Sequence, residues 1–195
     1  MLIKSVFSFV ILLSLAAVSK GQTQNLLQNP NADLRTANWQ TFGEASIEPC
    51  IGNDLCFVDR NGGHFFQDVT LPESSAGKFA LLIGRASAER INPDGSITDL
   101  PYLYGYMMGP SPTREETILA YLQGQGMGAT TRVRNDWVTL WGIFEVPEKT
   151  RSIRFFLNQA LRNGLPHNGS AARFDNVGLY LFSTRKDAEF FVSQY

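Results

Sequence analysis

The stretch WVTLWGIFEVP, residues 137–147, decides the fold class. Apolar residues recur at every second or fourth position, at Val138, Leu140, Phe144 and Val146, and the run ends at Pro147. A period of two residues is typical of a β-strand with one buried face, and proline ends a strand because it has no N–H to donate to a sheet. The stretch therefore predicts a strand that finishes at the proline.

The sequence on both sides of this stretch repeats the pattern. Ile153, Phe155 and Leu157 alternate with other residues, and residues 174–182 are apolar at nearly every position, which predicts a central strand covered on both faces. Further strands are expected at residues 64–70, 78–86, 102–108 and 117–123. Roughly eight strands in all suit an all-β jelly-roll β-sandwich of two antiparallel sheets.

Helical signals are weak by comparison. Residues 111–116, SPTREE, combine an N-cap serine with a following proline and early carboxylates, so a single helical turn is expected there. The pattern of residues 186–195 fits a short helix as well as an extra strand, and both alternatives stay open.

Composition places the chain among ordinary globular proteins. Of its 195 residues 44% are hydrophobic and 18% charged, which excludes a disordered tail protein. Lysine and arginine number 17 against 18 acidic residues and form no block. Nucleic-acid binding, which usually needs a concentrated basic surface, is therefore not expected.

The first 21 residues have the pattern of a cleaved secretory signal peptide. Lys4 precedes an apolar run from Val6 to Val18, and the small residues Ser19 and Gly21 suit a cleavage site. The alternative is a membrane anchor, but the run is shorter than the ~20 residues that span a bilayer. We expect a secreted protein, extracellular or periplasmic, with one domain over residues 22–195 and 15 basic against 18 acidic side chains.

The two cysteines lie close together, at Cys50 and Cys56. In an oxidising compartment such a pair predicts a local disulfide, which stabilises one loop by roughly 2 kcal/mol. Their spacing is not the C-x-x-C of a redox pair, and no histidine lies nearby to complete a zinc site.

Four segments together resemble a known family. They are NLLQNPNAD at 25–33 with Trp39 following, HFFQDV at 64–69 before GKF at 77–79, WVT and GIFEVP within 137–147, and FDNVGL at 174–179. In this order they are similar to the galactose-binding-like β-sandwich of extracellular carbohydrate-binding modules of families four, nine and twenty-two. The resemblance covers most of the chain after residue 21 and implies a β-sandwich that binds carbohydrate.

The resemblance also implies a metal. In the family, an acidic residue of the opening segment and the closing aspartate often join around a structural calcium, and the corresponding residues here are Asp33 and Asp175. Calcium takes six to eight oxygen ligands, so backbone carbonyls would supply most of them. The alternative is that Asp33 caps a turn and Asp175 accepts backbone hydrogen bonds.

A tyrosine stripe is the main candidate for ligand contact. Tyr102, Tyr104 and Tyr106 share one side of an expected strand, where aromatic rings stack on the C–H faces of sugars and polar groups bond to sugar hydroxyls. Alternatively, the stripe covers an edge of the core. Arg85 and Gln123 are the expected polar partners. Trp137 and Trp141, on a second face, are the next candidates, with half-buried packing as their alternative role.

Catalytic motifs are absent from the sequence. The chain has two histidines, His64 and His167, and neither a G-x-S-x-G nor an H-E-x-x-H motif. A glycoside hydrolase needs two carboxylates ~5–10 Å apart. Glu44, Glu48, Asp99 and Glu145 are available, but their spacing favours no pair.

We therefore predict a non-catalytic, lectin-like protein that binds a polysaccharide or glycan. Asn168, in an N-G-S sequon, is a predicted glycosylation site and marks a surface loop. The alternatives are an extracellular protein-interaction or structural module, and a glycoside hydrolase or polysaccharide lyase built on the same fold.

Overall fold

A computed structural model describes residues 23–50, 54–88, 99–111, 113, 116–123, 137–161 and 171–195. The expected signal peptide, residues 1–21, lies outside the described residues, as do His167 and the predicted glycosylation site Asn168. Within these described residues, eight strands, one 3-10 turn and one helix follow one another: β1 (Gln40–Pro49), β2 (Leu55–Thr70), η1 (Glu73–Ser75), β3 (Phe79–Ala88), β4 (Asp99–Gly109), β5 (Thr117–Gln123), β6 (Val138–Glu145), β7 (Ser152–Leu161), β8 (Ala171–Phe182) and α1 (Arg185–Val192).

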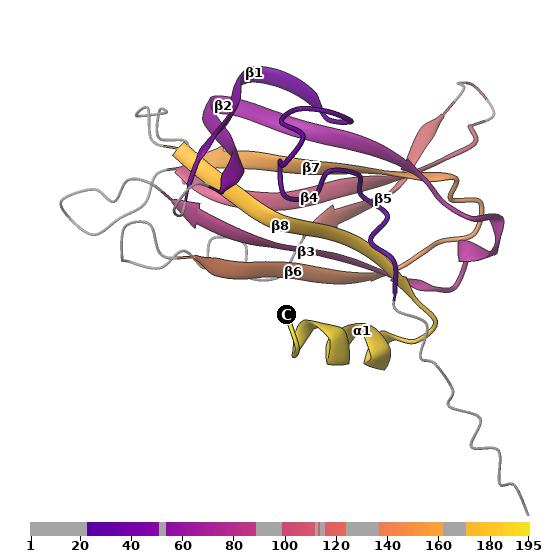
Figure 1. The fold of residues 1–195 in the computed structure, drawn as a ribbon. Coiled ribbons are helices and arrows are strands. Elements are labelled where there is room, and N and C mark those ends of the chain that lie inside the picture. Colours follow the sequence, from indigo (N-terminus) through magenta and orange to yellow (C-terminus); the bar gives the residue numbers. More distant parts are fainter. Residues whose placement is uncertain are drawn as a thin grey trace, which may run out of the picture.

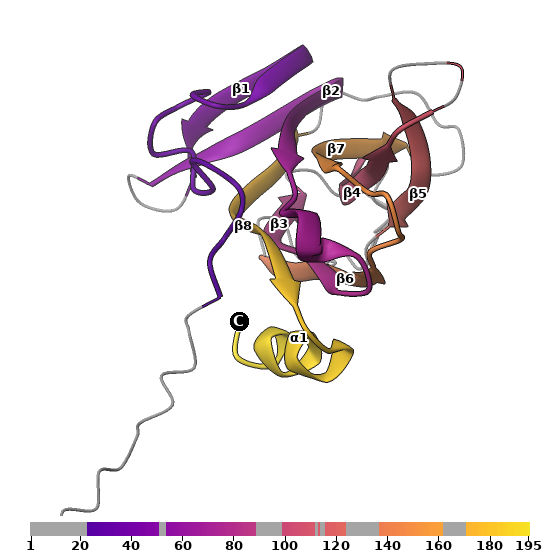
Figure 2. The same ribbon diagram turned by 90° about the vertical axis from the view of Figure 1, so that its right-hand side faces the viewer.

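All strand pairs are antiparallel, in the order β5-β4-β7-β2-β8-β3-β6, with β1 also paired to β2. The strands curl around a common interior (Figures 1 and 2). This arrangement confirms the predicted all-β jelly-roll sandwich. The expected central strand is β8, which lies between β2 and β3 with apolar side chains on both of its faces.

Strand β2 connects the two layers. Its first half, Phe57–Arg60, pairs with β8, and its second half, His64–Thr70, pairs with β7. The strand turns between these halves at Asn61 and Gly62, whose φ angles of 49° and 78° lie in the left-handed region that glycine adopts without strain. One layer therefore contains β5, β4, β7 and the second half of β2, and the other contains β6, β3, β8 and the first half.

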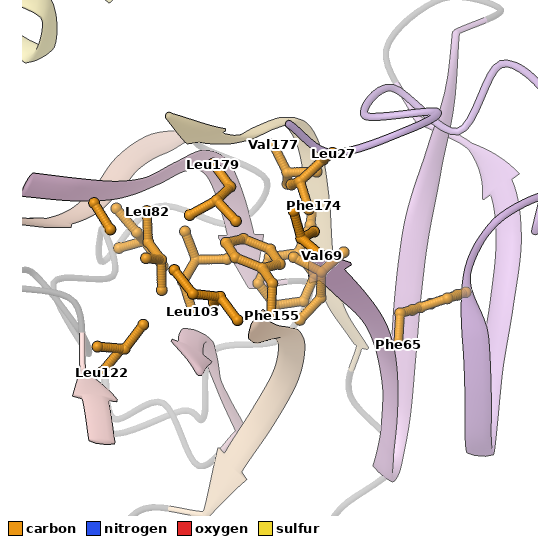
Figure 3. Close-up of a cluster of buried hydrophobic side chains, with 14 of the residues drawn as sticks. Leu27, Phe65, Val69, Leu82, Leu103, Leu122, Phe155, Phe174, Val177 and Leu179 are labelled. Atoms are coloured by element: carbon orange, nitrogen blue, oxygen red, sulfur yellow. The ribbon is translucent and has the colours of Figure 1, made fainter. Parts of the chain in front are cut away.

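The main core lies between the layers. Alternate residues of each strand point inward, as the period of two predicts, and Trp39 packs its ring against those of Phe57 and Phe155 at centroid distances of 4.8 and 6.2 Å. Figure 3 shows side chains from both layers meeting in this cluster, among them Leu82, Leu103, Phe155, Phe174 and Leu179. Burial of this apolar surface is the main stabilisation of the sandwich.

Helix α1 covers part of the outer surface of the second layer, below β3 and β6 in Figure 1. It begins where the hydroxyl of Thr184 accepts a hydrogen bond from the Asp187 N–H, and Arg185 forms an ion pair with Glu189 one turn on. Of the two alternatives for the C-terminal segment, the helix is the observed one. Its apolar side packs on a second cluster that contains Leu81, Ile83, Ile143 and Phe182.

Two segments that the sequence singled out have neither helix nor strand at their described residues. The opening segment of the family resemblance, residues 25–33, forms turns, with Asn29 and Ala32 at positive φ. In the expected helical turn at residues 111–116, the N–H of Thr113 bonds to the Ser111 hydroxyl at 3.3 Å without helix at either residue, and residues 112, 114 and 115 lie outside the described part. Polar side chains bonding to nearby backbone favour turns over regular structure.

Candidate functional site

The three predicted tyrosines lie on the outer surface of the first layer. Strand β4 alternates, with Leu103 and Met107 in the core and Tyr102, Tyr104 and Tyr106 half-buried on the opposite side. The strand pairs with β5 on one edge and with β7 on the other, so both neighbours place side chains beside the tyrosines.

The strand register aligns aromatic residues from five strands. Tyr106 pairs with Tyr121 of β5, and Tyr104 pairs with Phe156 of β7, which pairs in turn with Phe66 of β2. His64 of β2 pairs with Phe42 of β1. We call this surface the aromatic face; its residues are Tyr102, Tyr104, Tyr106, Tyr121, Phe156, Phe66, His64 and Phe42.

Successive rings of the aromatic face are in contact. Tyr104 stacks on Phe156 with ring centroids 4.5 Å apart and planes 5° from parallel, and Phe66 lies 5.5 Å beyond Phe156. Tyr106 meets Tyr121 edge to face at 5.3 Å. Neighbouring strands lie about 4.8 Å apart, so the face extends for about 19 Å across the strands.

The two ends of the aromatic face are its most exposed parts. Tyr121 has 69% of its surface exposed and Phe42 has 65%, whereas Phe156 in the middle has 7%. Phe42 stacks on His64 at a centroid distance of 5.0 Å. The face therefore has a packed floor and an exposed ring near each end.

The polar groups of the aromatic face carry little net charge. Arg154 of β7 forms a two-point ion pair with Asp68 of β2, with N–O distances of 2.7 and 2.8 Å, and its guanidinium carbon lies 5.2 Å from the centroid of the Phe66 ring. Burial lowers the pKa of His64, which favours the neutral imidazole. Burial also raises the pKa of the Tyr104 phenol, which shares hydrogen bonds with Tyr106 and Asn158. The surface thus offers rings, hydroxyls and an amide.

The structure separates the other predicted contact residues from the tyrosines. Trp141 packs with Leu81 and Ile83 in the cluster under α1, and Trp137 packs beside the disulfide. Arg85 lies on β3 with its guanidinium carbon 5.7 Å from the centroid of the Trp137 ring. All three belong to the second layer, whereas the backbone of Gln123, at the end of β5, pairs with Tyr104.

Five aromatic residues of this face were not among the predicted contacts: Phe42, His64, Phe66, Tyr121 and Phe156. Their strands were expected except for β1, but their alternation alone does not say which distant strands pair. The available signal was His64 and Phe66, two aromatic residues at alternate positions of β2.

The structure confirms the predicted disulfide and gives partners to two of the carboxylates considered for a hydrolase. Cys50 and Cys56 form the predicted disulfide, with Cα atoms 6.0 Å apart. Glu48 is ion-paired with Arg60, which holds the pKa of Glu48 at about 2, and Glu44 accepts a hydrogen bond from Asn61. Both carboxylates of β1 therefore bind side chains of the neighbouring strand β2.

The predicted calcium residues line one small hollow of about 240 Å³ together with Asp54 and the amides Asn31 and Asn176. Burial raises the pKa of Asp175, although its carboxylate accepts the backbone N–H of Asn176 at 2.8 Å. Within the described residues, no three acidic, histidine or cysteine side chains form a group that could hold a metal. A calcium ion here would therefore take most of its ligands from amide and backbone oxygens.

Comparison with solved structures shows what this arrangement resembles. TmCBM61, solved in complex with β-1,4-galactotriose, aligns over 82% of this chain and 99% of its own, with a TM-score of 0.52 and 15% identity. The CBM22-1-CBM22-2 tandem domain of Paenibacillus barcinonensis Xyn10C aligns over 83% of this chain and 47% of its own, with a TM-score of 0.53 and 11% identity. The chain has the β-sandwich fold of carbohydrate-binding modules.

The same comparison includes a domain with enzymatic activity. The enzymatically active domain of bacteriophage CBA120 tailspike protein 4 aligns with a TM-score of 0.56 and 13% identity. The alignment covers 81% of this chain and 21% of the tailspike chain. No protein-family model and no curated protein matches the sequence. None of the described helices has the length and apolar character needed to cross a bilayer.

Proposed function

We propose that this chain is a secreted, non-catalytic protein that binds an extended, uncharged polysaccharide on its aromatic face. The observation that carries the proposal is the unbroken row of ring contacts from Tyr121 to Phe42 across five strands. Sugar rings present C–H faces that pack on aromatic side chains, and their hydroxyls bond to phenol and amide groups at the edges of those rings.

The dimensions and charge of the face favour a chain of sugars over a single sugar. The rings form an open surface that extends for about 19 Å, which several sugar units can cover. A single small ligand is usually bound in a deep, enclosed pocket instead. The ion pair between Arg154 and Asp68 balances its own charge. An uncharged polymer, bound by stacking rather than by ion pairs, suits this surface best.

The test is binding of the chain from residue 22 to a panel of soluble neutral polysaccharides, measured by calorimetry. Tyr104→Ala removes the ring that stacks on Phe156, and Tyr121→Ala removes the most exposed ring of the face. Each change is expected to weaken binding at least tenfold, which corresponds to about 1.4 kcal/mol.

The matched control is Phe190→Ala, which removes an aromatic ring, 62% exposed, from α1 on the other layer. Its affinity should equal that of the unmodified chain. A panel without any bound polysaccharide would reject the proposal in favour of a protein-interaction or structural role. Release of reducing sugar ends during incubation would instead assign a hydrolase.

A further inference from the structure

A polar hollow of about 390 Å³ lies at the edge of β2, where β1 starts. It is lined by Leu26, Gln28, Asn38, Gln67, Asp68, Val69 and Thr70. Strand β1 pairs with β2 only as far as Gln40 opposite Phe66. Beyond Phe66, no strand of the described part of the chain pairs with this edge of β2. Alternate residues among 67–70 therefore turn their backbone groups away from β7, toward the hollow.

The hollow is held open by one buried side chain. The Gln67 amide accepts the N–H of Gln28 at 2.8 Å and donates to the Gln28 carbonyl at 3.0 Å. These two hydrogen bonds join the backbone of Gln28 to the side chain of Gln67 rather than to its backbone. The N-terminal segment therefore lies farther from β2 than a paired strand would. The volume of the hollow lies within the range of small-ligand sites.

The polar groups that line the hollow are available to a ligand. Asn38, Gln28 and Thr70 are exposed, and within the described residues their side chains make no hydrogen bond. The fourth group, Asp68, is paired with Arg154 and so adds no net charge. Amide, hydroxyl and backbone groups without net charge match the hydroxyls of a neutral sugar.

The hollow lies beside the aromatic face, displaced from it along β2. Asp68 and Thr70 follow Phe66 at alternate positions, on the same side of β2, so Asp68 is about 6.6 Å along the strand from Phe66. The aromatic face crosses the strands, whereas this displacement runs along β2. A polymer on the face would therefore reach the hollow with a side branch rather than with its main chain.

We infer that the hollow beside Phe66 is a subsite for a single neutral sugar branch on the polysaccharide. This inference rests on the proposed function, because the aromatic face must hold the main chain. Because only a branch reaches the hollow, the protein binds a branched polymer more tightly than the same polymer without branches. Stacking on the aromatic face alone does not give this preference.

The experiment compares binding to unbranched β-1,4-mannan with binding to galactose-branched mannan, and unbranched xylan with arabinose-branched xylan. At least one branched polymer is expected to bind about tenfold tighter than its unbranched backbone. Asn38→Gly removes the amide and keeps the backbone angle, since Asn38 has φ 68°. Thr70→Val removes the hydroxyl at constant shape.

Both variants should abolish the preference for the branched polymer and leave affinity for the unbranched one unchanged. Thr139→Val, the same change at an exposed position on β6 of the other layer, is the matched control. Tyr104→Ala should weaken the binding of both polymers by the same factor. Equal binding of branched and unbranched polymers, with Tyr104 still required, overturns the subsite alone, and absence of all binding overturns the proposed function with it.

Discussion

Asp59 is a fully buried carboxyl group in the interior of the sandwich. It lies on β2 between Ala45 of β1 and Ala172 of β8 in the strand register, and neither carboxyl oxygen has a hydrogen-bond partner in the part of the chain that the structure describes. Burial raises the pKa of Asp59 well above its ordinary value, because a charge without a partner is costly in an apolar interior.

This raised pKa predicts a pH-dependent stability. The folded Asp59 keeps its proton while the unfolded carboxyl ionises near pH 4, so the stabilisation is fully present below that pH and is lost as the pH rises. Asp59→Asn is neutral at every pH and similar in size. Its melting temperature relative to the unmodified chain should therefore increase between pH 4 and pH 8 in thermal melts. A difference that stays constant with pH would contradict the prediction.

The aromatic residues show what the sequence around one residue can predict and what it cannot. The spacing of Tyr102, Tyr104 and Tyr106 predicted that they share one side of a strand, and the structure places all three rings on one surface. The ring beneath Tyr104 is Phe156, 52 positions later in the sequence, and it arrives there through the pairing of β4 with β7. Pairing register depends on the whole sheet, so local alternation identifies a face but not the neighbours on it.

Among the secondary structure elements, the strands with strong alternation were predicted and β1 was not. Its sequence, QTFGEASIEP, contains a glycine at φ 64° and few apolar residues, and its side chains are mostly exposed. It is held by backbone pairing with β2 along nearly its whole length. A strand that is stabilised by its partner rather than by its own buried face leaves little hydrophobic pattern to detect.

Helix α1 is predicted to stabilise the second layer without contributing to binding. Phe191 packs its ring against Tyr180 and Phe182 at centroid distances of 4.6 and 5.5 Å. Phe191→Ala should lower the free energy of unfolding by about 3 kcal/mol and the melting temperature by about 6–12 °C. Phe190→Ala, next to it on the exposed side of α1, should cost less than about 1 kcal/mol.

Calorimetry of both variants with the bound polysaccharide completes this test. Because α1 covers the second layer and the aromatic face belongs to the first, the affinity of each folded variant should match that of the unmodified chain. A weaker affinity for Phe191→Ala at a temperature where it is folded would show that the two layers are coupled.

At the scale of the whole molecule, the two outer surfaces of the sandwich differ in what covers them. The second layer is covered by α1 over one cluster and by the disulfide, with Trp137, over another. No described element covers the rings of the first layer, where Tyr121 and Phe42 are exposed. Large exposed aromatic surfaces usually mark interaction sites, which is why the first layer and not the tryptophans carries the proposed function.

The hollow of Asp33, Asp54 and Asp175 provides the last prediction, because it joins the N-terminal turns, the start of β2 and the strand β8. A calcium ion bound there would tie the N-terminal turns to β8 and would stabilise the folded chain by about 2.7 kcal/mol at a concentration 100 times its Kd. The melting temperature should then be about 5–10 °C higher in calcium than in chelator. Asp175→Asn should abolish this difference, whereas Glu73→Gln, an equal loss of charge at an exposed residue of η1, should preserve it. Identical melting in calcium and in chelator would show that the three carboxylates act without a metal, with Asp175 serving as the acceptor for the Asn176 N–H.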